Sequence, residues 1–361
     1  MKQHERKAKR RGGRVTLACG ALALGLLAFG GAAAGPVAAA LPSRVDVFGG
    51  LTDRPAAGPG TNVLLMGTDG RDTISRTEKE TFHAGGAACG CSDVMMLVHV
   101  SRDHDRISVV SLPRDSYADI PGSGADADTT HPAKLNAAYK EGGPALAVRT
   151  VESMTGLRVD HFLQLDFRRF MDSVDALDGV DVCTSRQLTD SATHLDLAPG
   201  RHHLAGGPAL QYVRSRHVDN SADLGRIQRQ HRFLVNALRS DSLRDVLGDP
   251  RRALEFVSTA LGPQARVDQG FTPGDLLSLA RDLRQVPLSR TEFGTVPIAG
   301  FNHVVEGVGS TLRWDGPRAA AMFGTLREDR ALTPADSDTR PLDPPQMTVQ
   351  TIVHGDTLAC A

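Results

Sequence analysis

An uncharged, apolar stretch at residues 15–40, directly behind a basic tail, constrains this chain more than any other feature. The stretch consists mainly of Ala, Leu, Gly and Val. A helix needs about 20 such residues to cross the ~30 Å hydrocarbon core of a bilayer. Residues 1–14 carry seven Lys or Arg side chains and one Glu, and a basic flank of this kind stays in the cytoplasm. We therefore expect a cytoplasmic tail (1–14), a transmembrane anchor (15–40) and a single-pass type II protein of the plasma membrane, with the remainder of the chain extracytoplasmic.

Cleavage of the anchor is the alternative. Residues 38–40 are Ala-Ala-Ala, which suits a signal-peptidase site, and cleavage there would release a soluble ectodomain. We favour retention because the apolar stretch exceeds the roughly 7–15 residues of a signal-peptide core. Both outcomes place most of the protein outside the membrane.

The formal net charge of −1 conceals an acidic ectodomain. Without residues 1–14 the chain keeps 34 basic and 41 acidic side chains, a net charge of −7. This balance excludes a uniformly basic nucleic-acid binder, and the basic tail is too short to fold into a DNA-binding domain. We expect no nucleic-acid partner. The hydrophobic share of 40% suffices for a packed core.

Four cysteines follow the anchor, at positions 89, 91, 183 and 360. An extracytoplasmic compartment permits disulfides, and four cysteines allow three full connectivities, among which the sequence does not choose. A zinc site at Cys89 and Cys91 is the weaker interpretation, because no Cys/His pair with zinc-ligand spacing lies nearby.

Apolar runs and helical periodicity alternate along the ectodomain. Residues 41–60 are rich in Pro and Gly and are expected to form a linker. The patterns predict strands at 62–66, 94–100, 107–112, 162–165, 180–183 and 349–353, and helices at 144–157, 167–177, 224–238, 254–261 and 276–283. This alternation is typical of a layered α/β fold.

Two carboxylates stand at the ends of predicted strands. Asp69 follows the run 62–66, and Asp93 opens the run 94–100. If these strands are neighbours with those ends adjacent, the two carboxylates suit a hard cation such as Mg²⁺. The alternative is that each caps a turn through its own backbone, which Asp commonly does.

Several arginines stand out in an acidic ectodomain. They are Arg114, Arg214, Arg216, Arg226 and Arg229. Arg226, Arg229 and Gln230 have helical spacing and share one face. The planar guanidinium matches phosphate oxygens, so converging arginines would form a pyrophosphate site. The alternative for each of them is a solvated surface charge, since Arg is the preferred base of this chain.

Taken together, several motifs resemble the LytR–CpsA–Psr family. They are residues 62–71 (Asn-Val-Leu-Leu-Met-Gly-Thr-Asp-Gly-Arg), 92–100, 107–115 (ending Ser-Leu-Pro-Arg-Asp), 134–139 (Lys-Leu-Asn-Ala-Ala-Tyr), 197–200, 204–217 and 223–230. The resemblance implies a mixed central sheet sandwiched between helices, with an apolar tunnel for a polyprenyl chain. It places the catalytic core at 61–240, and residues 241–361 would complete or flank it.

The resemblance also implies a function. Family members are phosphotransferases that move a glycopolymer (teichoic acid, capsular or arabinogalactan-type) from a polyprenyl-pyrophosphate carrier to peptidoglycan and release polyprenyl phosphate. A non-catalytic polyprenyl-lipid binder, an envelope-stress regulator and a pyrophosphatase are the alternatives. Which glycopolymer is transferred stays open.

Motif positions imply roles for individual residues. Asp69 and Asp93 would hold Mg²⁺ on the pyrophosphate, and either could accept the proton of the attacking hydroxyl. The oxygens of the pyrophosphate would be bound by Arg114, Arg214, Arg216, Arg226 and Gln230, with Arg71 and Lys134 as further cations. The expected catalytic set is Asp69, Asp93 and Arg114.

One position departs from the family pattern. The family usually has an Arg two residues before the second aspartate, where this chain has Cys91. Arg71 or Arg76 could replace that cation, or a disulfide through Cys91 could fix the loop instead.

Overall fold

The computed structural model describes residues 42–86, 90–122, 129–333 and 351–360. The predicted tail (1–14) and anchor (15–40) lie outside these residues, as does Cys89. Among the helices of the described part, none is long and apolar enough to cross a membrane.

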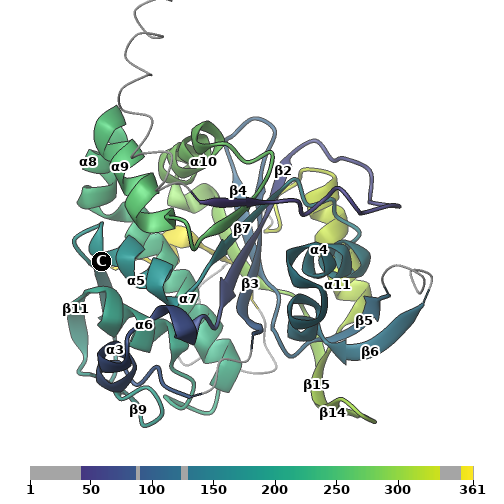
Figure 1. Ribbon diagram of the computed structural model, residues 1–361, viewed down its shortest axis with the longest axis horizontal. Coiled ribbons are helices and arrows are strands. Elements are labelled where there is room, and N and C mark those ends of the chain that lie inside the picture. The colour runs from purple at the N-terminus through teal and green to yellow at the C-terminus, as the bar shows by residue number, and fades with distance from the viewer. Residues whose placement is uncertain (1–41, 87–89, 123–128, 334–350, 361) are drawn as a thin grey trace, which may run out of the picture. The chain divides into compact units, whose positions relative to one another are not determined.

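A mixed sheet of eight strands forms the centre of the described part of the chain (Figure 1). Its spatial order is β1 (Ser43–Val45), β12 (Arg266–Asp268), β7 (His161–Leu165), β2 (Thr61–Thr68), β3 (Ser92–Val100), β4 (Ile107–Ser111), β13 (Thr291–Thr295) and β16 (Val353–His354). Strand β2 runs parallel to β7 and antiparallel to β3, while β4 runs parallel to β13. The mixed central sheet is therefore confirmed.

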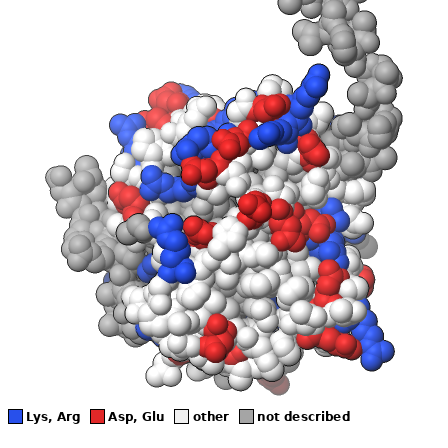
Figure 2. Space-filling view, turned by 90° about the vertical axis from the view of Figure 1, so that its left-hand side faces the viewer, with Lys and Arg blue, Asp and Glu red and all other residues white. Residues whose placement is uncertain are grey.

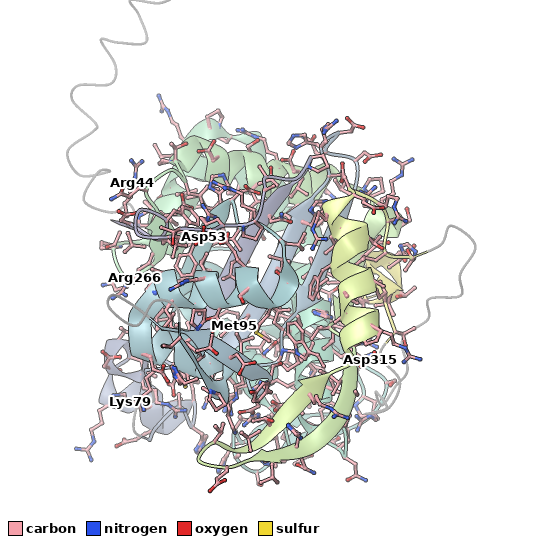
Figure 3. All side chains as sticks on the ribbon, turned by 90° about the vertical axis from the view of Figure 1, so that its right-hand side faces the viewer. Arg44, Asp53, Lys79, Met95, Arg266 and Asp315 are labelled. Atoms are coloured by element: carbon pink, nitrogen blue, oxygen red, sulfur yellow. A yellow bond between two sulfur atoms is a disulfide. The ribbon has the colours of Figure 1, made fainter. Side chains whose placement is uncertain are left out.

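Helices cover both faces of this sheet (Figures 1 and 3). One layer contains α4 (Leu135–Thr155) and α11 (Gly316–Arg327), and the other contains α7 (Ala222–Arg239), α9 (Pro250–Leu261) and α10 (Pro273–Gln285). Along β3, Met95 and Leu97 pack in the first core cluster, whereas Met96 and Val98 pack in the second. Burial on both faces explains why this strand is a continuous apolar run rather than an alternating one.

Smaller elements complete the fold. They are α3 (Arg76–Thr81), α5 (Phe167–Asp175), α6 (Gly206–Arg214), α8 (Asp241–Gly248) and the antiparallel pairs β5 (Tyr117–Pro121) with β6 (Thr130–Lys134), β8 (Val180–Thr184) with β11 (Gly200–Leu204), β9 (Leu188–Asp190) with β10 (Leu195–Leu197), and β14 (Ile298–Val305) with β15 (Gly309–Trp314). Strands β12, β13 and β16 all follow residue 241, so the C-terminal part belongs to the central sheet.

The structure differs from the sequence-based expectations in several places. Residues 41–60 are not merely a linker, because β1 pairs with β12 at the edge of the sheet and Val47 is buried. Helix α4 begins at Leu135, well before residue 144, and bends where Gly143 adopts a φ of 63°, which glycine tolerates. Helix α6 occupies a region that shows no helical periodicity.

Charges of both signs lie interspersed on the face shown in Figure 2. Lys and Arg side chains there neighbour Asp and Glu side chains. Among the described residues, Arg244 and Asp241 on α8, three residues apart in the sequence, form one exposed pair of this kind. This face therefore shows mixed polarity and not the continuous basic surface that nucleic acids require.

A disulfide joins Cys183, at the end of β8, to Cys360, with a Cα–Cα distance of 5.4 Å. The backbone N–H of Cys360 also donates a hydrogen bond to Asn236 Oδ1 on α7 (2.9 Å). Cys91 is disulfide-bonded as well. Of the three connectivities that the sequence left open, the structure thus selects one that contains the Cys183–Cys360 bond.

Removing the Cys183–Cys360 bond is expected to destabilise the protein. The bond spans 177 residues, and a cross-link over so long a loop restricts the unfolded chain strongly. We expect the double replacement Cys183→Ser and Cys360→Ser to lower the free energy of unfolding by about 3–4 kcal/mol in urea denaturation. A loss below about 1 kcal/mol would show that the C-terminus is held by its other contacts.

Candidate functional site

A cavity of about 410 Å³ opens where β2 and β3 meet helices α5, α6 and α7. The polar side chains that line it are Thr68, Arg71, Asp93, Arg114, Asp166, Arg214, Arg216, Arg226 and Gln230. Its apolar lining includes Leu65, Met96, Phe167, Phe170, Leu210, Val213, Phe233, Leu234 and Ala237. One cavity thus combines a cationic region with an apolar one.

The two strand-end carboxylates lie at the same end of neighbouring strands. In the register of β2 with β3, Gly67 faces Val94 and Thr68 faces Ser92, so Asp93 is the extra residue of a β-bulge. A bulge redirects the side chain of the extra residue, and Asp93 lines the cavity. Asp69 follows β2 directly, and its N–H donates to Cys91 O (3.2 Å). The adjacency on which the magnesium prediction depended is therefore present.

Each of these carboxylates is paired with an arginine. Arg71 Nε lies 2.6 Å from Asp69 Oδ1 and donates a hydrogen bond to Asp69 Oδ2 (2.7 Å). Arg114 forms an ion pair with Asp93. Burial by itself lowers the pKa of Arg114, but the charges of Asp93 and Asp115 outweigh burial and raise that pKa.

Helix α7 supplies a third acidic group to the cationic region. Asp223 Oδ1 lies 2.7 Å from Arg216 Nε, and Asp223 Oδ2 lies 3.4 Å from Arg226 Nη2. Burial raises the pKa of Asp223, but the charges of Arg226 and Arg216 prevail and lower it. Sequence reasoning did not single out Asp223, although its i, i+3 spacing to Arg226 indicated the contact.

Burial disfavours the charged form of two of the cavity arginines and so lowers their pKa values. It lowers the pKa of Arg226 to about 10, against the opposing attraction of Asp223. It also lowers the pKa of Arg214, together with the positive charge of Arg71. Both side chains remain protonated at neutral pH, and an anion beside them would reverse the penalty. Their environment therefore favours a bound anion such as a phosphate.

Phe167 lies beneath two of these cations. The guanidinium carbon of Arg214 is 4.9 Å from the centre of the Phe167 ring, and that of Arg71 is 5.8 Å away. An aromatic face attracts cations at these distances and holds their planes in place. Phe167 therefore separates the cationic region from the apolar one while positioning Arg71 and Arg214.

The remaining predicted residues lie in different places. Gln230 lines the cavity and donates to Val213 O (3.1 Å). Lys134 does not line it, but pairs with Asp115 (3.0 Å) beside a second cavity. Arg76 is exposed and pairs with Glu80, whereas Arg71 lines the cavity. Arg229 is buried and donates to Ser215 O, in a structural role.

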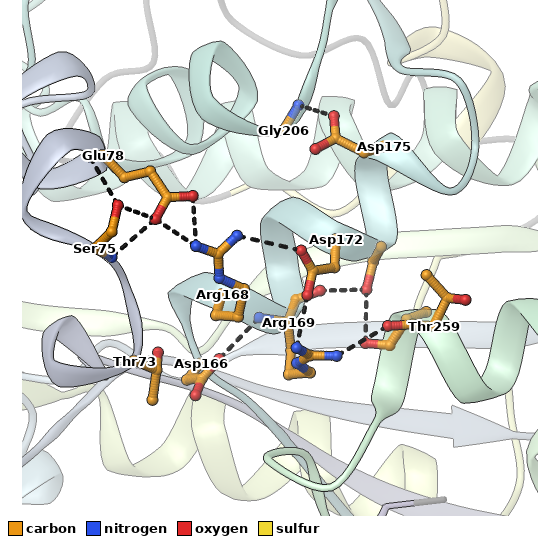
Figure 4. Close-up of polar contacts among 12 residues, drawn as sticks. Thr73, Ser75, Glu78, Asp166, Arg168, Arg169, Asp172, Asp175, Gly206 and Thr259 are labelled. Atoms are coloured by element: carbon orange, nitrogen blue, oxygen red, sulfur yellow. Dashed lines mark hydrogen bonds and ion pairs between the residues drawn. The ribbon is translucent and has the colours of Figure 1, made fainter. Parts of the chain in front are cut away.

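A network of polar contacts fixes helix α5, which carries Phe167 and Phe170 into the cavity (Figure 4). Asp166 caps the helix by accepting from Arg169 N (2.8 Å). Arg168 pairs with Glu78 on α3, and Arg169 Nη1 donates to Thr259 O on α9 (3.1 Å). Gly70 allows close approach here, because a Cβ atom would lie 2.6 Å from Asp166 Cβ.

The donor chemistry of the site fits a hard cation that shares its ligands with a phosphate. Within the described residues, no group of three or more His, Cys, Asp or Glu side chains could hold a metal. Mg²⁺ in phosphate sites commonly takes one or two carboxylates and completes its shell with water and phosphate oxygens. Asp69 is buried and pairs with Arg71, and Asp93 lines the cavity and pairs with Arg114, so these two carboxylates would be the ligands of such a cation.

Comparison with known proteins finds relatives that are named for cell wall biosynthesis. The probable cell wall biosynthesis protein LcpB of Corynebacterium glutamicum is 35% identical over 269 residues, 74% of this chain and 61% of LcpB. This chain thus spans about three fifths of that relative's length. The polyisoprenyl-teichoic acid–peptidoglycan teichoic acid transferase TagU of Oceanobacillus iheyensis is 28% identical over 253 residues, 68% of this chain and 69% of TagU.

A solved structure shares the fold. The LytR-Csp2A-Psr enzyme from Actinomyces oris is 22% identical, with a TM-score of 0.57 over 79% of this chain and 96% of that structure. The family model of LytR_cpsA_psr matches residues 47–328, which contain the cavity and all strands from β2 to β15. The chain therefore belongs to the LytR–CpsA–Psr family.

Proposed function

We propose that the protein transfers a glycopolymer from a polyprenyl-pyrophosphate carrier to peptidoglycan and releases polyprenyl phosphate. The observation that supports this most directly is a single cavity with arginines at one region and aromatic and aliphatic side chains at the other. A polyprenyl pyrophosphate has the same division into an anionic head and an apolar chain. The name of the relative TagU describes a transferase of this kind.

The chain's own residues account for the chemistry. In the proposed reaction the acceptor hydroxyl oxygen bonds to the phosphorus that carries the glycan, and the P–O bond to polyprenyl phosphate breaks. Arg114, Arg216 and Arg226 bind the phosphate oxygens as charge develops on them. The hydroxyl proton passes to a carboxylate of the site, and Asp93 lines the cavity, so we favour Asp93 over Asp69 as its acceptor.

Asp69 and Asp93 would also hold Mg²⁺ together with oxygens of the pyrophosphate. The bound cation neutralises negative charge on the phosphate groups. Two cations in the immediate surroundings, Arg71 and Arg114, already pair with these carboxylates. We infer that the pyrophosphate takes over these arginines when it binds, which frees carboxylate oxygens for the metal.

The test is a reconstituted reaction. Purified protein would be incubated with a polyprenyl-pyrophosphate glycan, Mg²⁺ and peptidoglycan fragments, and the products analysed by mass spectrometry. Release of polyprenyl phosphate with a glycan linked to peptidoglycan supports the proposal. Release without a linked product would indicate a pyrophosphatase, and binding without release would indicate a non-catalytic lipid binder.

Arg71 is expected to contribute to transfer, whereas Arg76 is not. Both follow the first aspartate, but only Arg71 reaches the cavity. We expect Arg71→Ala to lower kcat/KM by about 100-fold, as for the loss of one group that stabilises a developing oxyanion. Arg76→Ala serves as the matched control and is expected to retain full activity. Equal effects of the two replacements would contradict the assignment.

The location of the protein is also a proposal. We propose that residues 15–40 anchor it in the plasma membrane and that the domain from residue 41 onwards is extracytoplasmic. Protease added to intact protoplasts should then degrade the domain, while cytoplasmic proteins stay intact. Survival of the domain would contradict this orientation.

A further inference from the structure

A second cavity of about 360 Å³ lies beside the first one. Arg216 lines both cavities, and Asp115 follows directly after Arg114, which lines the first. The second cavity is bounded by the start of α7 and by the hairpin of β14 and β15. Its volume falls within the range of small-ligand sites.

Helix α7 orders the three regions along a single axis. Phe233 and Ala237 line the apolar region of the first cavity, Arg226 and Gln230 the cationic region, and Ala222, Asp223, Leu224 and Ile227 the second cavity. At ~1.5 Å per residue, Phe233 lies about 10 Å beyond Arg226 in one direction, and Ala222 about 6 Å beyond it in the other. The second cavity therefore lies toward the N-terminal end of α7 and the apolar region toward its C-terminal end, with Arg226 where the two cavities meet.

This order matters for phosphoryl transfer. The attacking oxygen and the leaving oxygen lie roughly in line on opposite sides of the phosphorus. In the proposed function the leaving group is polyprenyl phosphate, whose chain occupies the apolar region. The attacking hydroxyl then has to approach from the opposite side, where the second cavity lies.

The lining of the second cavity suits a sugar ring. Its hydrogen-bonding side chains are Asp115, Lys134, Arg216, His217, Ser221, Asp223, Asn302, Ser310 and Thr311. Phe301 adds an apolar surface of the kind that packs against the C–H face of a sugar. Neutral and charged donors and acceptors are thus mixed, whereas the first cavity concentrates arginines.

The hairpin wall is fixed to the segment that carries Arg114. Leu312 N donates to Asp115 O (2.8 Å), and Trp314 Nε1 donates to Ser116 Oγ (2.8 Å). Within the hairpin, Ser310 Oγ donates to Asn302 Oδ1 (3.2 Å). A ligand held by the hairpin is therefore held at a defined position relative to the phosphate that Arg114 binds.

We propose that the second cavity binds the acceptor glycan and presents its hydroxyl to the phosphorus. This inference rests on the proposed function. The hydroxyl oxygen forms the new P–O bond, the P–O bond to polyprenyl phosphate breaks with its electron pair leaving on that phosphate, and the hydroxyl proton is released to the site and finally to water. Asn302 and Phe301 position the acceptor sugar and do not contact the lipid.

The test compares KM values for the two substrates with full-length protein in detergent. We expect Asn302→Ala and Phe301→Ala each to raise KM for a peptidoglycan fragment about tenfold, the loss of roughly one hydrogen bond or packing contact. KM for the polyprenyl-pyrophosphate donor should stay within twofold. Val304→Ala is the matched control, because Val304 lies on the same hairpin, is 74% exposed and lines neither cavity.

The outcomes separate this inference from the proposed function. An unchanged acceptor KM in both variants would overturn it, and so would a rise in donor KM alone, which would assign the cavity to the donor glycan. If the unaltered protein releases no polyprenyl phosphate, the proposed function fails. In that case, binding of the peptidoglycan fragment to the unaltered protein and to Asn302→Ala is compared by isothermal titration calorimetry. Weaker binding by the variant supports an acceptor site in the second cavity, and equal binding overturns it.

Discussion

Replacing Arg114 by Ala is expected to lower the rate of glycopolymer transfer by at least about 10³-fold, the effect of removing an arginine that stabilises a transferring phosphoryl group. Arg114 lines the cavity and pairs with Asp93, so its loss removes a phosphate ligand and leaves that carboxylate uncompensated. The carboxylate of Asp93 and the phosphate of the substrate would then face each other without a cation between them. The measurement is the initial rate of polyprenyl phosphate release.

Two further variants make this prediction specific. Arg114→Lys keeps the charge but loses the planar fork, so we expect partial activity, between that of Arg114→Ala and the unaltered protein. Arg318→Ala is the control, because Arg318 is highly exposed and pairs with Asp315 at the start of α11. Thermal unfolding of each variant shows whether the fold persists. A folded Arg114→Ala protein with normal rates would refute the role of Arg114.

Replacing Asp93 by Asn is expected to lower kcat by about 10²–10³-fold, as for the loss of one preorganised group at a reacting phosphate. The amide keeps the shape of the side chain but loses the charge that pairs with Arg114 and that a hard cation prefers. The remaining activity should respond weakly to Mg²⁺, whereas that of the unaltered protein should disappear with EDTA and return with Mg²⁺.

Asp119→Asn is the control for this replacement. Asp119 accepts a hydrogen bond from Tyr117 Oη (2.7 Å) on strand β5 and does not line either cavity. Its variant should keep both the rate and the response to Mg²⁺. If Asp93→Asn retains the full Mg²⁺ dependence, the metal lies elsewhere, and the proposal for Asp69 and Asp93 has to be abandoned.

The strands at the centre of the sheet were predictable because strands that are buried on both faces consist mainly of apolar residues. Strand β3 packs on both faces, so Val94 to Val100 form an almost continuous apolar run. Strands β14 and β15 escaped prediction because they are largely exposed and carry no such run. Helix α6 escaped it because Gly206 and Gly207 resemble a turn, although a Cβ atom at Gly206 would lie 2.6 Å from Met171 O. Close packing has here overridden helix propensity.

Helical spacing identified a face of α7 but not the separate tasks on it. Arg226 and Arg229 are three residues apart and both buried, yet Arg226 lines the cavity and Arg229 holds Ser215 O. Only the position of neighbouring loops distinguishes them, and one sequence does not contain that information. The same holds for Asp223, because the turn before α7 is what brings Arg216 close enough to form an ion pair with it.

The place of β12 in the sheet determines when this domain can finish folding. Strand β12 pairs with β1 on one side and with β7 on the other, although it follows β1 by more than 200 residues in the sequence. Until residue 266 has emerged, β1 has no partner and β7 pairs only with β2, and the unpaired edge of a strand invites association with other chains. A chain that is synthesised from its N-terminus onwards therefore exposes the edge of β7 until late in its folding.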